Sequence, residues 1–234
     1  TASITHELRT PLTVIQAASD NLNSNLISKE RIPTYGKLIK QQTERLNNMI
    51  ENLLVFSKIE NNKAYKLNPS NINLANMIEQ IELQFKSIAN EKNIQIKWTK
   101  TNLNKNILLD KTIYELILSN LINNSIFHAY NGQKGEVRVT IHYSDQKKSI
   151  NTIIEDDGRG IPVKEQKYIW KSYYRGKKSI NEQERGSGLG LFIVNRNVSI
   201  LGGKVNLSSP YKRLNGKINN GCKFEFYIPC KEIK

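Results

Sequence analysis

The sequence predicts an α+β protein in which a two-helix hairpin precedes a sandwich of strands and helices. Three observations predict this class. Apolar residues recur at helical spacing in two long runs, at 8–26 and 39–56. A polar stretch at 60–71, with a proline near its end, follows these runs. Beyond it, segments of alternating apolar residues mix with further helical patterns, which favours helices packed over a mostly antiparallel sheet.

The first two runs predict an antiparallel helical hairpin. One stripe repeats at alternating steps of four and three residues, through Leu8, Leu12, Ile15, Ser19, Leu22 and Leu26. The second consists of Ile39, Gln42, Leu46, Met49, Leu53 and Phe56. A short polar break at 23–33 joins the helices. Because neither helix can bury its stripe alone, we expect residues 1–62 to form a homodimer with a dimeric four-helix bundle.

The remainder predicts a second domain. We expect residues 63–70 to be a linker and residues 71–234 to form the sandwich. Helical patterns cover 73–89, 110–129 and 188–203. Alternation predicts strands at 93–99, 137–143, 149–156 and 223–229. In the last strand, Phe224, Phe226 and Ile228 share one face.

Composition limits the function classes without choosing one. The 234 residues are 38% hydrophobic and 24% charged, as in globular proteins, and contain no run of about eighteen apolar residues. The net charge of +14 favours a polyanion such as a nucleotide triphosphate, nucleic acid, acidic protein or anionic lipid. The charges are spread along the chain, so charge alone does not separate these partners.

The two cysteines are expected to be reduced and buried. Cys222 and Cys230 flank one predicted strand, where eight extended residues would separate them by about 26 Å. A disulfide needs Cα atoms within about 7 Å of each other. The cysteines therefore cannot bridge each other there.

Two asparagines are candidate ligands for a metal and for phosphates. Asn120 and Asn124 lie four residues apart on a predicted helix, so their amides share a face. An amide oxygen is a hard neutral ligand suited to Mg²⁺ that triphosphate oxygens already hold. Taken alone the pair is a weak signal, because paired asparagines are common in a chain this rich in asparagine. We assign Mg²⁺ to Asn124, with Asn120 assisting at the phosphates. His128, one turn later, is expected to line the same nucleotide pocket.

The segment DDGRG at 156–160 is a candidate base-recognition loop. It ends a predicted strand, and Gly158 and Gly160 let the backbone approach a planar ligand closely. An ionised Asp156 only accepts hydrogen bonds, so it would favour the amino group of adenine over the carbonyl of guanine. An isolated Asp-Gly pair is more often a simple turn.

The segment GSGLGL opens a predicted helix and is a candidate phosphate site. Backbone N–H groups at a helix N-terminus, among glycines, bind anions. The candidate residues are Gly186, Gly188, Leu189, Gly190 and Leu191. The segment lacks the lysine of a P-loop and does not lie within a βαβ unit, which disfavours both of those nucleotide folds.

A basic, aromatic stretch at 169–185 connects these two segments. Trp170 and Tyr173 are expected to pack it against the domain. Tyr174 and Arg175 are candidate nucleotide contacts, because an arginine placed by aromatic neighbours can pair with phosphate. Lys177, Lys178 and Arg185 could also meet a triphosphate, although surface lysines are more often only solvated.

These motifs occur in one order over nearly the whole chain, beginning with SITHELRTPL at 3–12. In order and spacing the chain resembles the catalytic core of a sensor histidine kinase of two-component signalling. LLVFSKIE at 53–60 also matches the usual end of the second hairpin helix in that family. The resemblance implies a phosphoacceptor hairpin of the HisKA type, then a Bergerat (GHKL) ATP-binding domain of the HATPase_c type. It implies ATP and Mg²⁺ as cofactors.

The resemblance makes His6 the phosphoacceptor. A neutral imidazole has a lone pair that can attack phosphorus near pH 7. Glu7 is then the general base that takes the other ring proton. By the same resemblance, Thr10 polarises the water that dephosphorylates a partner. Pro11 lacks an N–H, so the helix can bend just beyond the histidine.

The resemblance also implies partners. We expect autophosphorylation followed by transfer to an aspartate of a response regulator, which docks on the helix surface between Pro11 and Asp20. The hairpin begins almost at Thr1, so we expect an upstream, membrane-anchored sensor region and a cytoplasmic location for this portion.

Two alternatives compete with this interpretation. Gyrase-, Hsp90- and MutL-like ATPases share the fold but place a water-activating glutamate where this chain has Asn120, which favours a kinase. A basic nucleic-acid-binding module would explain the charge of +14 but would leave DDGRG, GSGLGL and His6 as coincidences. We therefore expect no direct contact with nucleic acid.

Overall fold

The computed structural model describes residues 2–24, 28–60, 67–130, 133–176, 188–213 and 216–233. Within these ranges, the side chains at 2–4, 6, 7, 29, 44, 45, 48 and 51–60 lie outside the description. None of the helices in the described ranges is both long and apolar enough to cross a membrane.

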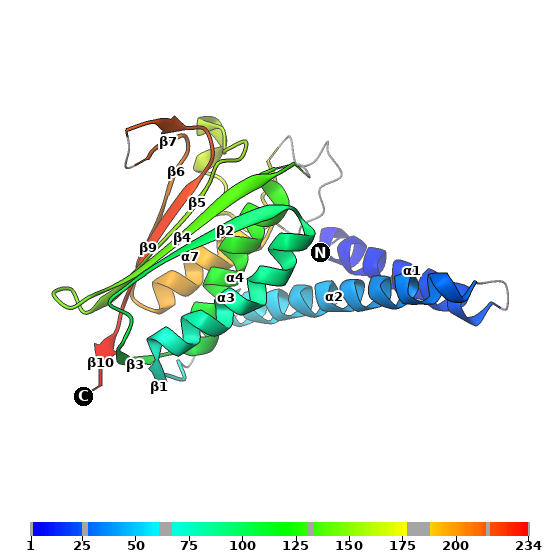
Figure 1. The fold of residues 1–234 in the computed structure, drawn as a ribbon, viewed down its shortest axis with the longest axis horizontal. Helices are drawn as coiled ribbons and strands as arrows, with labels where there is room; N and C mark the ends of the chain where they lie inside the picture. Colours follow the sequence, from blue (N-terminus) through cyan, green and yellow to red (C-terminus); the bar gives the residue numbers. More distant parts are fainter. Residues whose placement is uncertain are drawn as a thin grey trace.

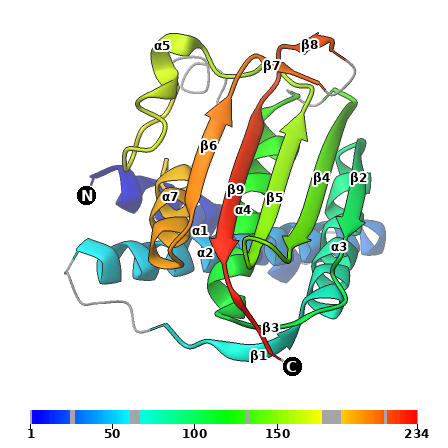
Figure 2. The same cartoon turned by 90° about the vertical axis from the view of Figure 1, so that its left-hand side faces the viewer.

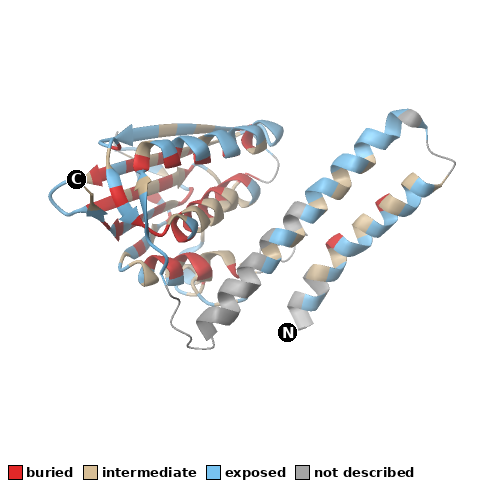
Figure 3. Cartoon of the chain, turned by 90° about the horizontal axis from the view of Figure 1, so that it is seen from below, coloured by how far each residue is buried: buried red, intermediate tan, exposed pale blue. Residues whose placement is uncertain are grey.

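The N-terminal part is the expected helical hairpin. Helix α1 (Ala2–Asn23) leads through the 3₁₀ helix η1 (Lys29–Arg31) into α2 (Ile32–Glu60). The hairpin extends away from the sheet, and the N-terminal end of α1 lies at the end of the hairpin nearer the sheet (Figures 1 and 3). The described members of the two predicted stripes stay half-buried, except for Leu12, which is 48% exposed. One copy of the chain therefore leaves much of this apolar surface uncovered.

The second part is an α+β sandwich built on a five-stranded sheet in the order β2-β4-β5-β9-β6. Its strands are β2 (Ile94–Thr101), β4 (Gly135–Ser144), β5 (Ser149–Asp156), β6 (Lys204–Ser208) and β9 (Lys223–Pro229). The β2–β4 pair is parallel and the other pairs are antiparallel. The sheet is therefore mostly antiparallel, as predicted. Helices cover one face of the sheet (Figure 2). They are α3 (Leu74–Glu91), α4 (Lys111–His128) and α7 (Gly190–Ile200).

Short elements complete the domain. A small sheet joins β1 (Ser70–Asn73), β3 (Asn106–Leu109) and β10 (Lys231–Glu232). A two-stranded ribbon pairs β7 (Tyr211–Lys212) with β8 (Ile218–Asn219), and α5 (Val163–Gln166) follows the loop after β5. These elements were not predicted, because stretches of two to four residues carry little periodicity.

The core lies between the helices and the sheet. Phe224, Phe226 and Ile228 are at most 3% exposed, which confirms the predicted inner face of β9. Helix α4 is buried along most of its length, and Asp110 caps it by accepting the N–H of Ile113 at 3.2 Å. This burial fixes the helix that carries the two candidate asparagines. Cys222 and Cys230 are free and buried, as predicted.

Candidate active site

A cavity of about 330 Å³ lies between α4, the loop after β5, the segment that follows α5 and the start of α7. Residues from all four predicted nucleotide motifs line it. They are Asn120, Asn124, His128, Asp156, Gly160, Tyr174, Arg175, Gly188, Gly190 and Leu191. Residues as far apart in the sequence as Asn120 and Leu191 therefore enclose one space.

The two asparagine amides meet the first residue of α7. The Asn120 Nδ2 donates to the carbonyl of Leu116 at 2.8 Å, which leaves Asn120 Oδ1 as the outward-facing atom. A Cβ built on Gly190 would lie 3.0 Å from Asn120 Oδ1 and 3.9 Å from Asn124 Oδ1. Both amide oxygens thus face the glycine-rich start of α7. Two hard neutral oxygens therefore lie beside a glycine-rich helix start of the kind that binds phosphates. This donor set fits a magnesium ion that phosphate oxygens also hold.

Asp156 is a buried acceptor in the cavity wall and is 3% exposed. Its Oδ1 accepts the N–H groups of Gly158 and Cys222, each at 3.1 Å, and its Oδ2 accepts the Ser125 hydroxyl at 3.4 Å. Burial raises the pKa of Asp156 to about 6, against the lowering effect of these hydrogen bonds. The carboxylate is therefore ionised at neutral pH and titrates close to it.

Two glycines have backbone conformations that other residues rarely adopt. Gly160 has φ +68° and a Cβ there would lie 1.9 Å from the carbonyl of Asn220. Gly188 has φ +64°, and a Cβ would lie 2.7 Å from the backbone of Tyr173. Both positions line the cavity, so glycine is required where the loops approach each other most closely.

Aromatic contacts hold the segment after α5 against the domain. The Trp170 ring packs edge-on against Phe224 of β9, with centroids 6.1 Å apart. The Tyr174 ring stacks on Tyr168 at 5.8 Å. Trp170 is half-buried and packs against the core, whereas Tyr173 is 37% exposed with φ +61°. Tyr174 and Arg175 are thereby placed on the cavity wall.

Comparison with known proteins identifies the family. The model described as histidine kinase-, DNA gyrase B- and HSP90-like ATPase matches residues 109–232, more than half of the chain. The chain belongs to this family. A second model, of the His Kinase A (phospho-acceptor) domain, matches residues 1–62. Together the two matches show that the chain carries the catalytic core of a protein-histidine kinase.

Relatives agree with this assignment. The chain is 26% identical over 232 residues to sensor histidine kinase WalK of Bacillus subtilis (strain 168), covering 99% of this chain and 36% of WalK. The histidine kinase core therefore spans about a third of the length of that relative.

Solved structures confirm the predicted fold. Full-length ShkA in complex with AMPPNP matches with a TM-score of 0.69 at 24% identity, over 99% of this chain and 46% of that one. Histidine kinase ThkA in complex with the response regulator protein TrrA matches with a TM-score of 0.64 at 22% identity. That match covers 98% of this chain and 60% of ThkA.

Some of the predicted nucleotide-site residues of the kinase core do not line this cavity. Gly158 lines a smaller neighbouring cavity and donates its N–H to Asp156. Leu189 is 1% exposed and packs against Ile193 under the start of α7. Gly186, with Lys177, Lys178 and Arg185, lies outside the described residues.

The predicted phosphotransfer residues lie on α1 of the kinase core. The backbone of His6 and Glu7 is helical, but their side chains are outside the described part. Thr10 is half-buried, and Pro11 is buried within α1, which continues to Asn23. The helix therefore accommodates the proline without ending there.

Several residues of the cavity were not predicted from the sequence. Ser125 and Cys222 both donate to Asp156, and Arg159 and Glu165 line the wall. Ser125 follows Asn124 directly, so its position was a usable signal. Cys222 carried no signal, because only the pairing of β9 with β5 brings it to Asp156. Phe127, beside His128, points outward at 45% exposure with the Lys92 ammonium 5.3 Å above its ring.

Proposed function

We propose that this kinase core uses ATP to phosphorylate its own His6 and then passes the phosphoryl group to an aspartate of a response regulator. The single observation that carries the proposal is the cavity in which the Asn120 and Asn124 oxygens, Asp156 and the start of α7 converge. The match of residues 1–62 to a phospho-acceptor domain supports the choice of His6.

Each side of the cavity has a distinct task toward the nucleotide. Asp156 accepts the adenine amino group, because an ionised carboxylate is only an acceptor. The backbone N–H groups at 188–190, at the start of α7, face the phosphates, and Arg175 adds positive charge. Asn124, assisted by Asn120, would hold Mg²⁺, which neutralises phosphate charge when bound.

Phosphorylation exchanges one bond for another. A ring nitrogen of His6 forms the N–P bond with the γ-phosphorus while the bond from phosphorus to the β–γ bridging oxygen breaks, and ADP leaves with that electron pair. Glu7 takes the proton from the other ring nitrogen. The N-terminal end of α1, which carries His6, lies at the end of the hairpin nearer the sheet (Figure 1).

Two partners are expected, a response regulator and a second copy of the chain. The solved complex of ThkA with the response regulator protein TrrA supports a regulator as the partner. The docking surface that we propose lies on α1 between Pro11 and Asp20. The half-buried stripes of the hairpin support a homodimer. Thr10 then polarises the water that removes phosphate from the regulator. A membrane-anchored sensor region upstream stays a prediction.

The rival function, simple ATP hydrolysis, has one specific observation in its favour. Glu165 brings a carboxylate to the cavity, and a Cβ on Gly176 would lie 2.6 Å from its Oε2. A carboxylate can activate water. It comes from α5, however, whereas Asn120, on α4, is an amide at the position where the related ATPases have a glutamate.

Labelling with γ-labelled ATP and Mg²⁺ tests the proposal and the rival together. We expect an acid-labile, base-stable label on the chain, its loss in His6→Gln, and its retention in Glu165→Gln. Rapid release of free phosphate without labelling of the chain, abolished by Glu165→Gln, would establish the hydrolase instead.

A further inference from the structure

The ribbon β7–β8 lies against the strand end that carries Asp156. Gly221, just after the ribbon, approaches so closely that a Cβ there would lie 2.0 Å from the Asp156 carbonyl oxygen. The Ser209 hydroxyl, just before it, accepts the Ile161 N–H at 2.8 Å and donates to the Gly221 carbonyl at 2.9 Å. The ribbon is thus joined at both ends to the loop that lines the nucleotide cavity.

At Asp156 the β5–β9 ladder is altered. The register pairs Glu155 with Lys223, so Asp156 faces Cys222 one step on. In a regular antiparallel pair of this type, each residue donates to the carbonyl of the other. Here the Asp156 N–H donates to the Cys222 carbonyl at 2.9 Å, but the Cys222 N–H donates to the Asp156 Oδ1. The Asp156 carbonyl instead accepts the Tyr211 hydroxyl at 3.1 Å.

The Tyr211 hydroxyl therefore takes the place of a ladder bond. It satisfies the Asp156 carbonyl, and this leaves the Cys222 N–H available to the carboxylate. Without the hydroxyl, the buried carbonyl would lack a donor, at the free-energy penalty of an unmet hydrogen bond. In a regular ladder the Cys222 N–H would donate to this carbonyl, and its shift to that position would remove one hydrogen bond from the carboxylate.

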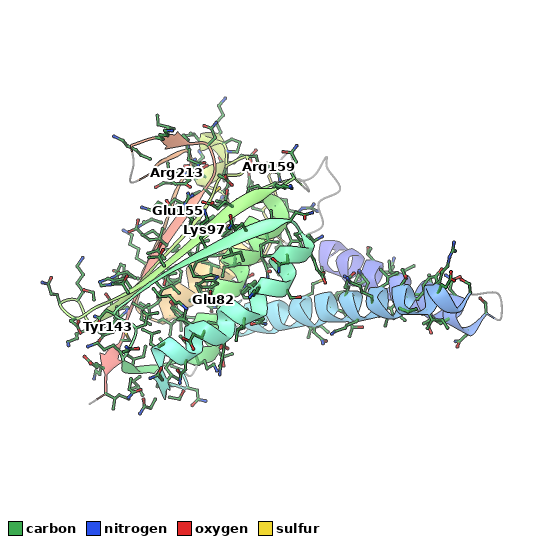
Figure 4. The ribbon with its side chains drawn as sticks, in the orientation of Figure 1. Glu82, Lys97, Tyr143, Glu155, Arg159 and Arg213 are labelled. Carbon is green, nitrogen blue, oxygen red and sulfur yellow. The ribbon has the colours of Figure 1, made fainter. Side chains whose placement is uncertain are left out.

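Arg138 of β4 holds Tyr211 in place. Its Nη2 donates to the Tyr211 hydroxyl at 2.9 Å, so the phenol proton is directed toward Asp156. Its Nη1 and Nε pair with Glu136 at 2.7 Å and Glu155 at 3.4 Å. Tyr211 is 4% exposed, which excludes water as an easy substitute donor. Figure 4 shows Glu155 at the same end of the sheet as Arg159 of the cavity wall.

We propose that Tyr211, held by Arg138, is a positioning residue that sets the Asp156 carboxylate for adenine recognition. The proposal rests on the proposed function, in which Asp156 accepts the adenine amino group. It makes the ribbon β7–β8 part of the nucleotide site, although neither of its strands contributes to the described lining of the cavity.

A double-mutant cycle on the full chain tests this role. The Kd for ATP is measured for Tyr211→Phe, Asp156→Ala and the double variant, with the thermal midpoint recorded for each. We expect Tyr211→Phe to raise the Kd about threefold to tenfold, as for one lost hydrogen bond. In the Asp156→Ala background the same change should add nothing, because there is no carboxylate left to position.

Two further variants complete the experiment. Tyr227→Phe removes a phenol hydroxyl from the outer side of β9, where Tyr227 is 42% exposed, and should leave the Kd unchanged. Arg138→Lys keeps the positive charge but loses the planar guanidinium that makes several hydrogen bonds at once. It should therefore also raise the Kd for ATP. It provides the same test if Tyr211→Phe does not fold.

The outcomes separate the two levels of inference. Additive effects in the cycle, or a lower thermal midpoint with an unchanged Kd, would overturn the positioning role while leaving Asp156 as the adenine acceptor. An unchanged Kd in Asp156→Ala would instead remove the proposed function of Asp156, and with it the basis of the inference.

Discussion

At the scale of single residues, the proposed role of Asp156 would make nucleotide binding depend on pH. Burial raises its pKa from 3.8 to about 6, so the fold disfavours the ionised form and this group adds most stability below pH 4. The proposed recognition of adenine by Asp156 needs that ionised form. Protonation therefore opposes binding as the pH falls through about 6.

We expect the Kd for ATP to rise as the pH falls below 6, approaching tenfold per unit from this group alone. Isothermal titration between pH 5 and pH 8 measures it. Asp156→Asn removes this titration, so its profile should contain only the contributions of the other ionisable groups, such as the nucleotide phosphates and His128 of the cavity wall. Parallel profiles for the two proteins would show that Asp156 does not govern binding.

Gly160 is the residue at which substitution should destabilise the loop most directly. Gly160→Ala places a Cβ against the Asn220 carbonyl and forces alanine to φ +68°. We expect a loss of about 2 kcal/mol in the free energy of unfolding. Urea denaturation measures it. Gly36→Ala in α2, where a Cβ would meet nothing within 4 Å, should stabilise the hairpin by about 0.5–1 kcal/mol.

Residue types alone predicted much of this site. Asn120, Asn124, Asp156 and Gly160 were identified because their chemistry suits phosphates, a metal or a base. Cys222 had no such signature, since its N–H donates to Asp156 and any residue except proline could supply that bond.

At the scale of elements, Asp110 fixes the helix that carries the asparagines. Its Oδ1 accepts the Ile113 N–H, and its Oδ2 accepts the Asn68 N–H at 3.0 Å, while it is 4% exposed. Asn73 caps α3 in the same way through the Asn76 N–H, at an exposed position.

Asp110→Ala should therefore lower the free energy of unfolding by about 1–2 kcal/mol. Asn73→Ala should lower it by about 0.5–1 kcal/mol, because water reaches the N–H that this change frees. Chemical denaturation of both variants compares them. Equal losses would mean that burial does not decide the strength of a cap here.

Long elements were predictable, and short ones were not. The alternation of SINTIIED matches β5 (Ser149–Asp156) residue for residue, whereas α7 is shorter than the predicted 188–203. The ribbon β7–β8 has two residues in each strand, so it carries no period that sequence analysis could detect.

At the scale of the whole molecule, the exposed side of the hairpin predicts association. Leu12 belongs to the predicted stripe and is 48% exposed in one copy. In the expected homodimer this leucine would be covered by a second chain.

Leu12→Asp should then raise the dimer dissociation constant about a hundredfold, because it would bury an unpaired carboxylate. Analytical ultracentrifugation measures the change. Leu83→Asp, on α3 at 69% exposure, is the matched control and should leave association unaltered. If Leu83→Asp alone dissociated the dimer, the interface would lie on the sheet domain and not on the hairpin.

The sequence by itself determined the class of this protein, its long helices and strands, and the residue types of a phosphoryl-transfer site. These follow from periodicity and side-chain chemistry, which are local properties. Only the tertiary structure decided that Asp156 receives its hydrogen bonds from Ser125 and Cys222 and that Tyr211 meets its carbonyl. Such contacts join segments 31 to 66 residues apart, and only strand pairing and core packing bring those segments together.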